Sequence, residues 1–526
     1  MKLSNSAQMR EIDRYAIDEL GISGTILMSN AAEHVAAAAL ERLPPDGNVA
    51  VFCGTGNNGG DGIGAAACLL DKGVSVRAFL IGSDEKLTSD SIEMFKRFDS
   101  LGGALEPFIV SDELTDFLTK CDIIIDAIIG TGLNSDLSGD VLAAVNMINA
   151  SKACVIAADI PSGVSSDSGA IMGGAVRADV TITFSLAKQG HFVEPGCICR
   201  GELRVCDIGI PPDIVDGAVS YVHAVMPEHV ELPRRRLDSH KGDYGRCLII
   251  AGSTGYTGAP ALSARAASRM GAGLVYLGVP ESIYGVMAVK LDEEMPFPLP
   301  TDRNGRLAAN AAGEILRRAG ECDVCLIGPG LGRSPEITEL VLSVIRIVKA
   351  PVVVDADGLN AVSGYTDVLE KAMHPRILTP HYGEFARLIG GATDAGGPSD
   401  SDKPGGVPPP SVTDKLREAR LFAKNNRCYL VLKGHRTITA SPDGSAYINT
   451  TGGPAMAKGG SGDVLAGMIA ALIGQKFPPD AAIRTAVYIH GLAGDMCAAE
   501  LGEYSVTAGD VVDMLPKAAM SIAARS

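Results

Sequence analysis

The chain has 526 residues, enough for about two to four domains that each bury a hydrophobic core. Apolar residues make up 46% of the chain and aromatic residues 5%, with 62 glycines, which is typical of an α/β protein rather than a β-sandwich. The net charge of −16, without a dense Lys/Arg block, argues against a nucleic-acid groove. An anionic ligand would need backbone N–H groups, helix ends or metal ions.

The amino-terminal residues lack the apolar stretch of a signal peptide, and no run of about 18 apolar residues occurs in the chain. We therefore expect a cytoplasmic protein that does not bind a membrane. In a reducing compartment, the twelve cysteines are expected to be buried thiols rather than disulfides. Cys322 and Cys325 have the spacing of a redox or zinc motif, but the segment continues as an apolar strand without a second pair nearby.

The first half of the chain alternates short apolar runs with glycine-rich turns and helical segments. Residues 3–42 read as helical, and a further helix is predicted over residues 60–70. Strands are predicted at residues 49–53, 74–81, 121–128, 153–159, 180–185 and 201–207. This order of strand, glycine turn, helix and strand predicts a parallel sheet with helices on both faces.

A proline- and arginine-rich stretch with little periodicity, residues 211–240, separates two units. We place the domains at residues 1–220 and 221–526. The second unit is also α/β, with strands predicted at residues 245–253, 274–279, 324–327, 352–355, 376–378 and 429–433. Residues 391–410, rich in Gly, Pro, Ser and Asp, are expected to be an unstructured surface insertion.

Polar groups of the first unit follow the predicted strands. Residues 54–59 contain a GxGxxG pattern, which alone weakly favours a dinucleotide fold, and the next strand ends without the acid that would hold a ribose. Residues 57–62 read Asn-Asn-Gly-Gly-Asp-Gly, and paired amides with an acid at a helix start can bind a polar ligand and a cation. Asp126 and Asp159 end further strands, so all these groups are expected to converge at one edge of the sheet.

Four segments together resemble the epimerase domain of the NAD(P)H-hydrate repair enzymes: residues 57–62, 126–132, 159–163 and 188–192. The resemblance implies a Rossmann-like domain that interconverts the R and S forms of hydrated NADH or NADPH, with Asp159 as the acid/base catalyst. It implies K⁺ ligands at Asn58, Asp126 and Ser162. The implied contacts to the hydrate are Asn57, Asn58, Gly59, Gly60, Asp61, Gly130, Thr131, Gly132, Leu133, Asn134, Ser135, Asp136 and Asp159.

The second unit carries a glycine-rich loop, residues 451–463, that ends in Asp463 and continues into an apolar helix. Small residues let the backbone close on a phosphate, and the helix N-terminus directs unpaired N–H groups at it. A carboxylate there would repel phosphate, but it can take a proton from a hydroxyl that attacks the phosphate. Further glycine- or acid-bearing strand ends at residues 252–259, 328–332, 355–360, 379–384 and 433–437 predict a nucleotide-sized crevice.

This half resembles the dehydratase domain of the same repair enzymes, which is similar in fold to the ribokinase family, over residues 230–520. The resemblance implies that ADP or ATP binds against Lys433, Gly434, His435, Arg436, Thr437, Lys458, Gly459, Gly460, Ser461 and Gly462. The hydrate would contact Ala259, Gly330, His381, Glu384 and Asp463, with Asp463 as the catalytic base. Mg²⁺ is expected to neutralise the phosphates, with Asp355, Asp357 and Glu384 as candidate outer-sphere ligands.

The implied function is the repair of NADH and NADPH hydrates. Phosphorylation of the hydroxyl of the S-hydrate would turn a poor leaving group into phosphate, and elimination would restore NAD(P)H, with AMP and phosphate as further products when ADP is used. The epimerase would convert the R form to the S form. The cofactors and co-substrate are then K⁺, Mg²⁺ and ADP, and we expect a homo-oligomer.

Two other interpretations remain at this stage. A kinase for a hydroxymethyl-pyrimidine or a sugar would use the same Gly-Ser-Gly-Asp loop, but it would release a stable phosphorylated product. Alternatively, the first domain is a non-catalytic ligand-binding module, because Ser29 and Ala32 stand where the epimerase family has Glu and Gly. The Asn-Asn-Gly-Gly-Asp segment argues against the kinase, and the retained Asp126 and Asp159 argue against a decayed domain.

Overall fold

The computed structural model describes residues 1–390 and 412–523, which fall into two compact units. Residues 2–222 form the amino-terminal unit, and the carboxy-terminal unit contains residue 1, residues 223–390 and residues 414–523. The insertion predicted at residues 391–410 lies outside the described residues. Within the described ranges, no helix is long and apolar enough to cross a membrane.

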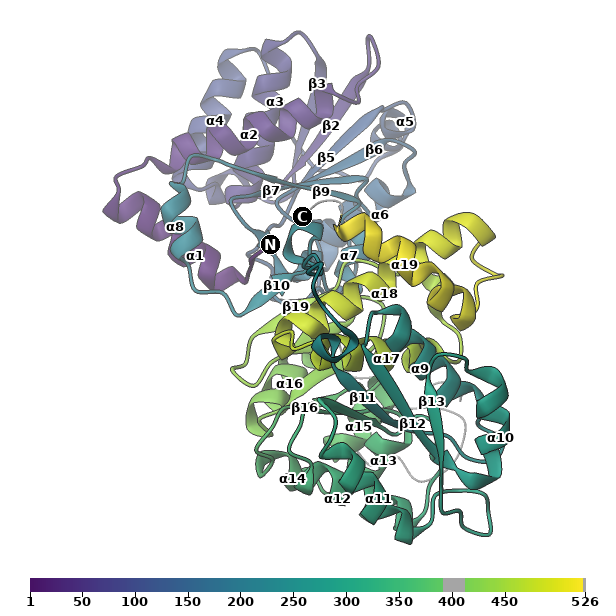
Figure 1. Ribbon diagram of the computed structural model, residues 1–526. Helices are drawn as coiled ribbons and strands as arrows, with labels where there is room; N and C mark the ends of the chain where they lie inside the picture. Colours follow the sequence, from purple (N-terminus) through teal and green to yellow (C-terminus); the bar gives the residue numbers. More distant parts are fainter. Residues whose placement is uncertain (391–411, 524–526) are drawn as a thin grey trace. The chain divides into compact units, whose positions relative to one another are not determined.

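The centre of the amino-terminal unit is a seven-stranded parallel sheet in the order β4-β3-β2-β5-β6-β7-β9 (Figure 1). Its strands are β2 (Asn48–Cys53), β3 (Ser75–Leu80), β4 (Leu105–Pro107), β5 (Ile123–Ala127), β6 (Cys154–Ala158), β7 (Val180–Phe184) and β9 (Glu202–Cys206). All residues of β5 are buried, as expected for a parallel strand covered on both faces. A separate parallel pair joins β1 (Leu3–Ser4) to β8 (Ala187–Lys188).

Helices cover both faces of this sheet. On one face, α2 (Gly24–Leu40), α3 (Asn57–Asp71) and α4 (Ser89–Ser100) share an apolar core with the strands. On the other face lie α5 (Asp112–Thr119) and α6 (Gly139–Ala150). The remaining helices are α1 (Ser6–Arg14), which continues into a π-helix (Tyr15–Glu19), α7 (Gly196–Cys199) and α8 (Pro212–Gly217).

The carboxy-terminal unit contains a ten-stranded sheet in the order β10-β19-β18-β17-β16-β15-β14-β11-β12-β13. The parallel part runs from β17 to β13, and β18 and β19 add antiparallel strands beside β17. The strands are β10 (Val222–Ala224), β11 (Arg246–Ile250), β12 (Leu274–Pro280), β13 (Met295–Leu299), β14 (Val324–Ile327), β15 (Val352–Val354), β16 (Arg376–Leu378), β17 (Tyr429–Leu432), β18 (Ile438–Ala440) and β19 (Ala446–Ile448).

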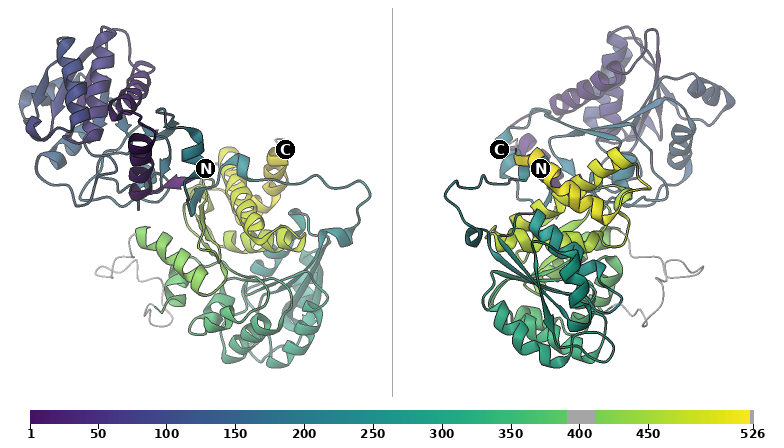
Figure 2. Two further views of the ribbon diagram at one scale, coloured as in Figure 1. Left: turned by 90° about the vertical axis from the view of Figure 1, so that its left-hand side faces the viewer. Right: turned by 45° about the vertical axis from the view of Figure 1, so that its right-hand side comes forward.

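Helices form two layers around this second sheet, as Figures 1 and 2 show from three directions. One layer shares an apolar core with the strands and consists of α9 (Gly258–Arg269), α10 (Glu281–Lys290), α17 (Ser461–Gly474), α18 (Pro479–Leu501) and α19 (Ala508–Ala523). The other helices are α11 (Ala312–Ala319), α12 (Pro335–Ile347), α13 (Asp357–Val362), α14 (Asp367–Glu370), α15 (Tyr382–Leu388) and α16 (Val412–Asn425).

The predicted α/β class with parallel sheets is confirmed, and two local predictions are wrong. Residues 3–42 are not helical throughout, because Leu3 and Ser4 form β1 beside β8. The helix predicted from residue 60 begins at Asn57, so the Asn-Asn-Gly-Gly-Asp segment forms its first turn. All twelve cysteines are free and nine of them are buried, in agreement with the prediction of buried thiols.

Candidate functional sites

A cavity of about 690 Å³ opens in the amino-terminal unit where β2, β5 and β6 end. Of the predicted site residues, it is lined by Asn57, Asn58, Asp61, Gly130, Thr131, Gly132 and Asp159. Gly59 and Gly60 are buried inside α3, and Asn134, Ser135 and Asp136 are exposed and, like Leu133, are not among the lining residues. The strand ends therefore bring Asn57, Asn58, Asp61, residues 130–132 and Asp159 to one cavity, and residues 133–136 do not line it.

Asp159 is held in place by its backbone conformation and by neighbouring side chains. Its backbone has a φ of +63°, in the left-handed region that non-glycine residues rarely adopt. Its Oδ1 accepts hydrogen bonds from Lys188 Nζ at 2.5 Å and Thr183 Oγ1 at 3.1 Å. Burial alone would raise the pKa of Asp159, but the charge and hydrogen bond of Lys188, together with His191 and the Thr183 hydroxyl, outweigh it and the pKa is lowered. Asp159 is thus held as a carboxylate.

His191 supports the same residue from the backbone side. Its Nδ1 accepts the Lys188 N–H at 3.1 Å, and its Nε2 donates to the Asp159 carbonyl oxygen at 3.0 Å. Burial and the Lys188 charge lower the pKa of His191 to about 3, so the ring is neutral. Lys188 and His191 lie in the Lys-Gln-Gly-His-Phe segment, and the sequence motif carried no assigned role for either of them.

A set of oxygen atoms lies beside the cavity at the end of β5. The Asp126 carboxylate is fully buried, and it accepts hydrogen bonds from the Ser162 hydroxyl at 2.6 Å and the Ser162 N–H at 2.8 Å. Desolvation raises the pKa of Asp126 to about 6. Both polar atoms of the Asn58 amide are buried and have no hydrogen-bond partner among the described residues. Carboxylate, hydroxyl and amide oxygens are ligands that suit a hard cation, and the Asn58 amide is the group left unsatisfied here.

The two residues that depart from the epimerase family pattern do not line the cavity. Ala32 is fully buried in α2, where it faces Gly64 of α3. Ser29 accepts a long hydrogen bond from Arg97 at 3.4 Å. Between them, Asn30 donates to the Ile208 carbonyl at 2.7 Å, and Ile208 is a lining residue.

Gly59 is required by the close approach of α3 to the preceding turn, because a Cβ atom at this position would lie 1.8 Å from the Gly54 carbonyl oxygen. We expect Gly59→Ala to lower the free energy of unfolding of the amino-terminal unit by about 1–3 kcal/mol, the usual cost of overpacking. Thermal denaturation would measure the change. Gly56→Ala is the matched control, because a Cβ there meets nothing within 4 Å. Equal melting temperatures for both variants would contradict the prediction.

In the carboxy-terminal unit, a buried ion pair lies at the start of the helix that follows the glycine-rich loop. Lys433 Nζ, after β17, is 2.7 Å from Asp355 Oδ1, after β15, and Thr379 also donates to this oxygen. A Cβ on Gly462 would lie 3.0 Å from Lys433 Nζ, so this ammonium reaches the first turn of α17. Burial and the Asp355 carboxylate raise the pKa of Asp463, in the same turn, to about 7.

Hydrogen bonds to α18 hold the glycine-rich loop in place. Gly452 N–H donates to Asp495 Oδ2 at 2.9 Å, and the Thr451 hydroxyl donates to the Tyr488 carbonyl at 2.8 Å. Gly460 closes the loop with a φ of +97°, a conformation that favours glycine. Ser461 then begins α17; its own N–H donates to the Lys458 carbonyl, and the N–H groups that follow it in the first turn can bind an anion. No sequence motif points to Asp495, because it lies within the long helix α18.

Neighbouring strand ends complete this second site. Gly330 lies close to α9, since a Cβ on it would be 3.4 Å from Ala259 Cβ. His381 caps α15, and its Nδ1 accepts the N–H groups of Gly383 and Glu384. Burial and the Lys433 charge lower the pKa of His381. Ala259, Gly330 and His381 therefore occupy strand or helix ends of one sheet edge.

Basic residues of the predicted nucleotide site are partly committed to protein partners. Lys458 Nζ donates to the Tyr504 carbonyl at 2.6 Å, and Arg436 donates to the Thr450 carbonyl at 2.7 Å. Thr437 bonds back to Gly434 at 2.9 Å, which forms a tight turn after β17. Lys433, in contrast, reaches the first turn of α17, because a Cβ on Gly462 would lie 3.0 Å from its Nζ.

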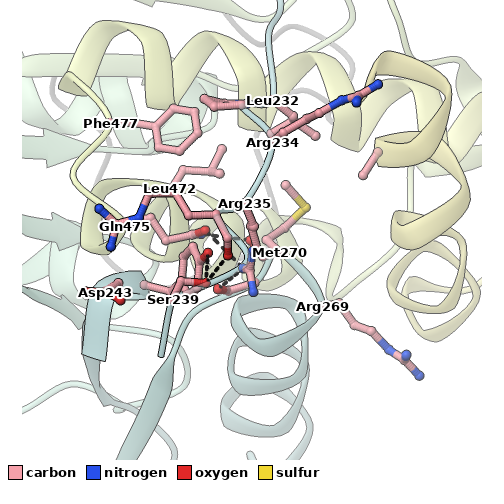
Figure 3. A pocket seen from close by; sticks show the side chains of 15 residues that line it. Leu232, Arg234, Arg235, Ser239, Asp243, Arg269, Met270, Leu472, Gln475 and Phe477 are labelled. Carbon is pink, nitrogen blue, oxygen red and sulfur yellow. Dashed lines mark hydrogen bonds between the residues drawn. The ribbon is translucent and has the colours of Figure 1, made fainter. Parts of the chain in front are cut away.

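A separate hollow of about 550 Å³ in the same unit is rich in arginine (Figure 3). Arg235 is already committed, because its Nη2 donates to the Gly271 carbonyl at 2.6 Å and its guanidinium stacks on Tyr244. Figure 3 shows the side chains of Arg234 and Arg269 directed away from Arg235. None of the predicted site residues lines this hollow.

Comparisons with known proteins find a different family model in each of the two units. The family model described as NAD(P)H-hydrate dehydratase matches residues 247–517, and that of the YjeF-related protein N-terminus matches residues 24–190. A bifunctional NAD(P)H-hydrate repair enzyme Nnr from Moorella thermoacetica is 40% identical over 527 residues, covering 98% of this chain and 96% of that relative. The chain belongs to the family of bifunctional NAD(P)H-hydrate repair enzymes. The family resemblance seen in the sequence is thereby confirmed.

Another bifunctional NAD(P)H-hydrate repair enzyme, from Thermofilum pendens, is 38% identical over 522 residues and covers 98% of this chain and 96% of its own length. Among solved structures, an ADP/ATP-dependent NAD(P)H-hydrate dehydratase from Bacillus subtilis, co-crystallised with ATP and Mg²⁺, is 30% identical. It covers 57% of this chain and 99% of its own, with a TM-score of 0.47.

Proposed function

We propose that the chain repairs hydrated nicotinamide nucleotides with two sites, one in each unit. The R- and S-hydrates of NADH and NADPH are interconverted in the amino-terminal cavity. The S-hydrate is dehydrated in the carboxy-terminal site, with a nucleotide as the phosphoryl donor. The observation that carries the proposal is the pairing of family membership over the whole chain with a separate strand-end site in each unit.

In the dehydration, Asp463 is the base. Its place in the first turn of α17 puts the carboxylate beside the N–H groups that would hold the transferring phosphoryl group. Asp463 takes the proton of the hydrate's hydroxyl group while the oxygen of that hydroxyl group attacks the terminal phosphorus of the nucleotide. Loss of phosphate from the carbon that carried this hydroxyl group and of a proton from the adjacent ring carbon then forms the double bond that restores NAD(P)H, with AMP as the other product when ADP is used. Lys433 balances the negative charge at the same helix start.

In the epimerisation, Asp159 is the acid/base residue. The hydrated ring carbon bears a hydroxyl group and the ring nitrogen, so its configuration can invert when one of these bonds opens and closes again. Opening requires that a proton be taken up or released. Asp159 is suited to this step because Lys188 holds it as a carboxylate at the cavity wall.

ADP is the proposed phosphoryl donor, with Mg²⁺ held by its phosphates. The three candidate carboxylates already have protein partners: Lys433 for Asp355, Gly332 N–H for Asp357 and His381 N–H for Glu384. Among the residues described, no group of three or more His, Cys, Asp or Glu side chains could hold a metal ion. The protein would therefore contact Mg²⁺ from outside its first shell of ligands. Homo-oligomerisation and a cytoplasmic location stay predictions.

K⁺ is the proposed cation of the epimerase site, where it would be held by Asn58, Asp126 and Ser162. The unsatisfied Asn58 amide and the buried Asp126 carboxylate fit a hard cation. When bound, the ion would offset the carboxylate charge and fix the Asn58 side chain at the cavity.

Exchange of K⁺ for choline at constant ionic strength is expected to slow epimerisation and leave dehydration of the S-hydrate unchanged. Asn58→Ala should raise the K⁺ concentration for half-maximal epimerisation by about tenfold or more, the scale seen when a metal site loses a supporting group. Epimerisation rates across a K⁺ titration measure this. A wild-type rate that is independent of K⁺ would refute the assignment.

The proposed function is tested on a mixture of R- and S-hydrates of NADPH with purified protein, ADP and Mg²⁺, by following the absorbance of NADPH. Complete recovery of NADPH with stoichiometric phosphate and AMP would establish both activities. Recovery that stops at the S fraction would leave only the dehydratase and a non-catalytic amino-terminal domain. No recovery with ADP or ATP would instead favour a small-molecule kinase.

A further inference from the structure

The amino-terminal helix α1 forms one wall of the epimerase cavity. Met9 and Asp13 line the cavity from α1, and Ile17 does so from the π-helix that continues it; these positions follow one another at intervals of four residues. They therefore lie on one face of the helical segment. The segment is tied to the rest of the site, since Ser4, just before it, is paired with Lys188.

Further hydrogen bonds fix the start of α1. Asn5 and Gln8 form a reciprocal capping box, with distances of 2.8 and 2.9 Å. The Ser6 hydroxyl donates to Asp167 at 2.9 Å. Asp13 is consequently presented to the cavity from an anchored helix and not from a loose terminus.

The Asp13 carboxyl group is half-buried and makes no hydrogen bond or ion pair within the described part of the chain. Desolvation, offset by Lys188 and reinforced by Asp159, raises its pKa to about 6. Asp61 also lines the cavity; it is 9% exposed and makes no hydrogen bond to any described residue. Two carboxyl groups without protein partners thus face the same space as Asp159, which indicates a ligand that hydrogen-bonds to several acids.

We propose that Asp13 is a second catalytic residue of the epimerase, which exchanges a proton with the ring nitrogen of the hydrate while Asp159 exchanges one with its hydroxyl group. This inference rests on the proposed epimerase function. It assigns a reacting group to a helix that precedes residues 24–190, the range matched by the amino-terminal family model.

The reaction removes one proton from the oxygen and delivers one to the nitrogen, and two such groups balance this exchange. The Asp159 carboxylate takes the hydroxyl proton, and the C–O bond becomes a carbonyl as the bond from this carbon to the ring nitrogen breaks. The electron pair stays on the nitrogen, which takes a proton from the Asp13 carboxyl group. Rotation about the adjacent C–C bond turns the aldehyde over. The nitrogen then attacks the other face, returning its proton to Asp13 while the oxygen regains its proton from Asp159.

The charged groups that surround this exchange come from several elements. A group with a pKa near the working pH is an efficient proton carrier, and its charge depends on its neighbours. The titratable and charged groups that line the cavity with Asp13 are Arg10 of α1, Asp61 of α3, Asp90 of α4, Asp159 after β6 and Lys188 of β8.

The test uses the full chain without ADP or ATP, so that only epimerisation of purified S-hydrate of NADPH proceeds, followed by chromatography of the R form. Asp13→Asn should lower kcat above the spontaneous background by about 100-fold or more, and Asp13→Glu should recover part of it. The matched control is Glu11→Gln, which removes one exposed charge from the same helix and should stay near the wild-type rate. With ADP added, all variants should dehydrate the S-hydrate normally.

A pH series separates a catalytic from a structural role. The wild-type kcat should show a limb near pH 6 that Asp13→Asn lacks. The proposal is overturned if Asp13→Asn keeps kcat within about threefold of wild type, or if only KM rises. A wild-type chain that does not epimerise while it dehydrates normally would refute the proposed epimerase function itself.

Discussion

Replacement of Asp463 with asparagine is expected to lower the rate of S-hydrate dehydration by about 10²–10⁴-fold, the range that a general base contributes. The variant keeps the glycine-rich loop and the Lys433–Asp355 ion pair, so nucleotide binding should survive. Recovery of NADPH from purified S-hydrate with ADP and Mg²⁺ measures the rate. Epimerisation, measured without nucleotide, should be unchanged.

The matched control for this variant is Asp513→Asn, which removes an equal charge from the exposed side of α19. It should dehydrate at the wild-type rate. If Asp463→Asn retains more than about a tenth of the wild-type kcat, Asp463 is not the base, since loss of the proton acceptor should cost at least about 100-fold.

Replacement of Asp159 with asparagine is expected to abolish epimerisation above the spontaneous rate and leave dehydration of the S-hydrate intact. It should also destabilise the amino-terminal unit, because the Lys188 side chain is only 2% exposed and would lose its charged partner. Breaking a buried ion pair from one side costs about 3–5 kcal/mol. Chromatography of the R and S forms and thermal denaturation measure the two effects.

The double variant Asp159→Asn with Lys188→Met distinguishes these effects. It removes the unpaired charge, so it should regain much of the lost stability without any epimerase activity. Activity in the stable double variant would show that Asp159 is dispensable. Full stability of the single variant would show that Lys188 is not held as a charged group by Asp159.

Most of the parallel strands were predictable because they are short apolar runs, several of them followed by a glycine or an acid, as in Val352–Val354 before Asp355. Among the strands that were missed are β4 and β13 at the edges of their sheets and the antiparallel β18 and β19, because none of these combines an apolar run with a following glycine or acid. The two residues of β1 became a strand only through their tertiary partner β8, a contact that local sequence does not encode.

Some site residues were likewise predictable from contiguous motifs, and others come together only in the tertiary structure. Asp463 is apparent because loop and acid lie within one contiguous motif, as do the polar residues that begin α3. The Lys433–Asp355 ion pair joins residues that are 78 positions apart, so their pairing could not be anticipated. Asp13 and Lys188 were missed as site residues for the same reason: α1 has an ordinary amphipathic sequence, and only its packing against the cavity gives Asp13 a role.

The pairing of β1 with β8 has a consequence for the order of folding during synthesis. Ser4 and Ala187, which bond at this junction, are separated by 183 residues, so the second residue leaves the ribosome long after the first. Non-local contacts of this kind form late, because the entropy cost of closing a long chain loop must be met before the contact can stabilise the fold. The amino-terminal helix must therefore wait undocked until almost the whole unit has been made, and the cavity that it walls is completed last.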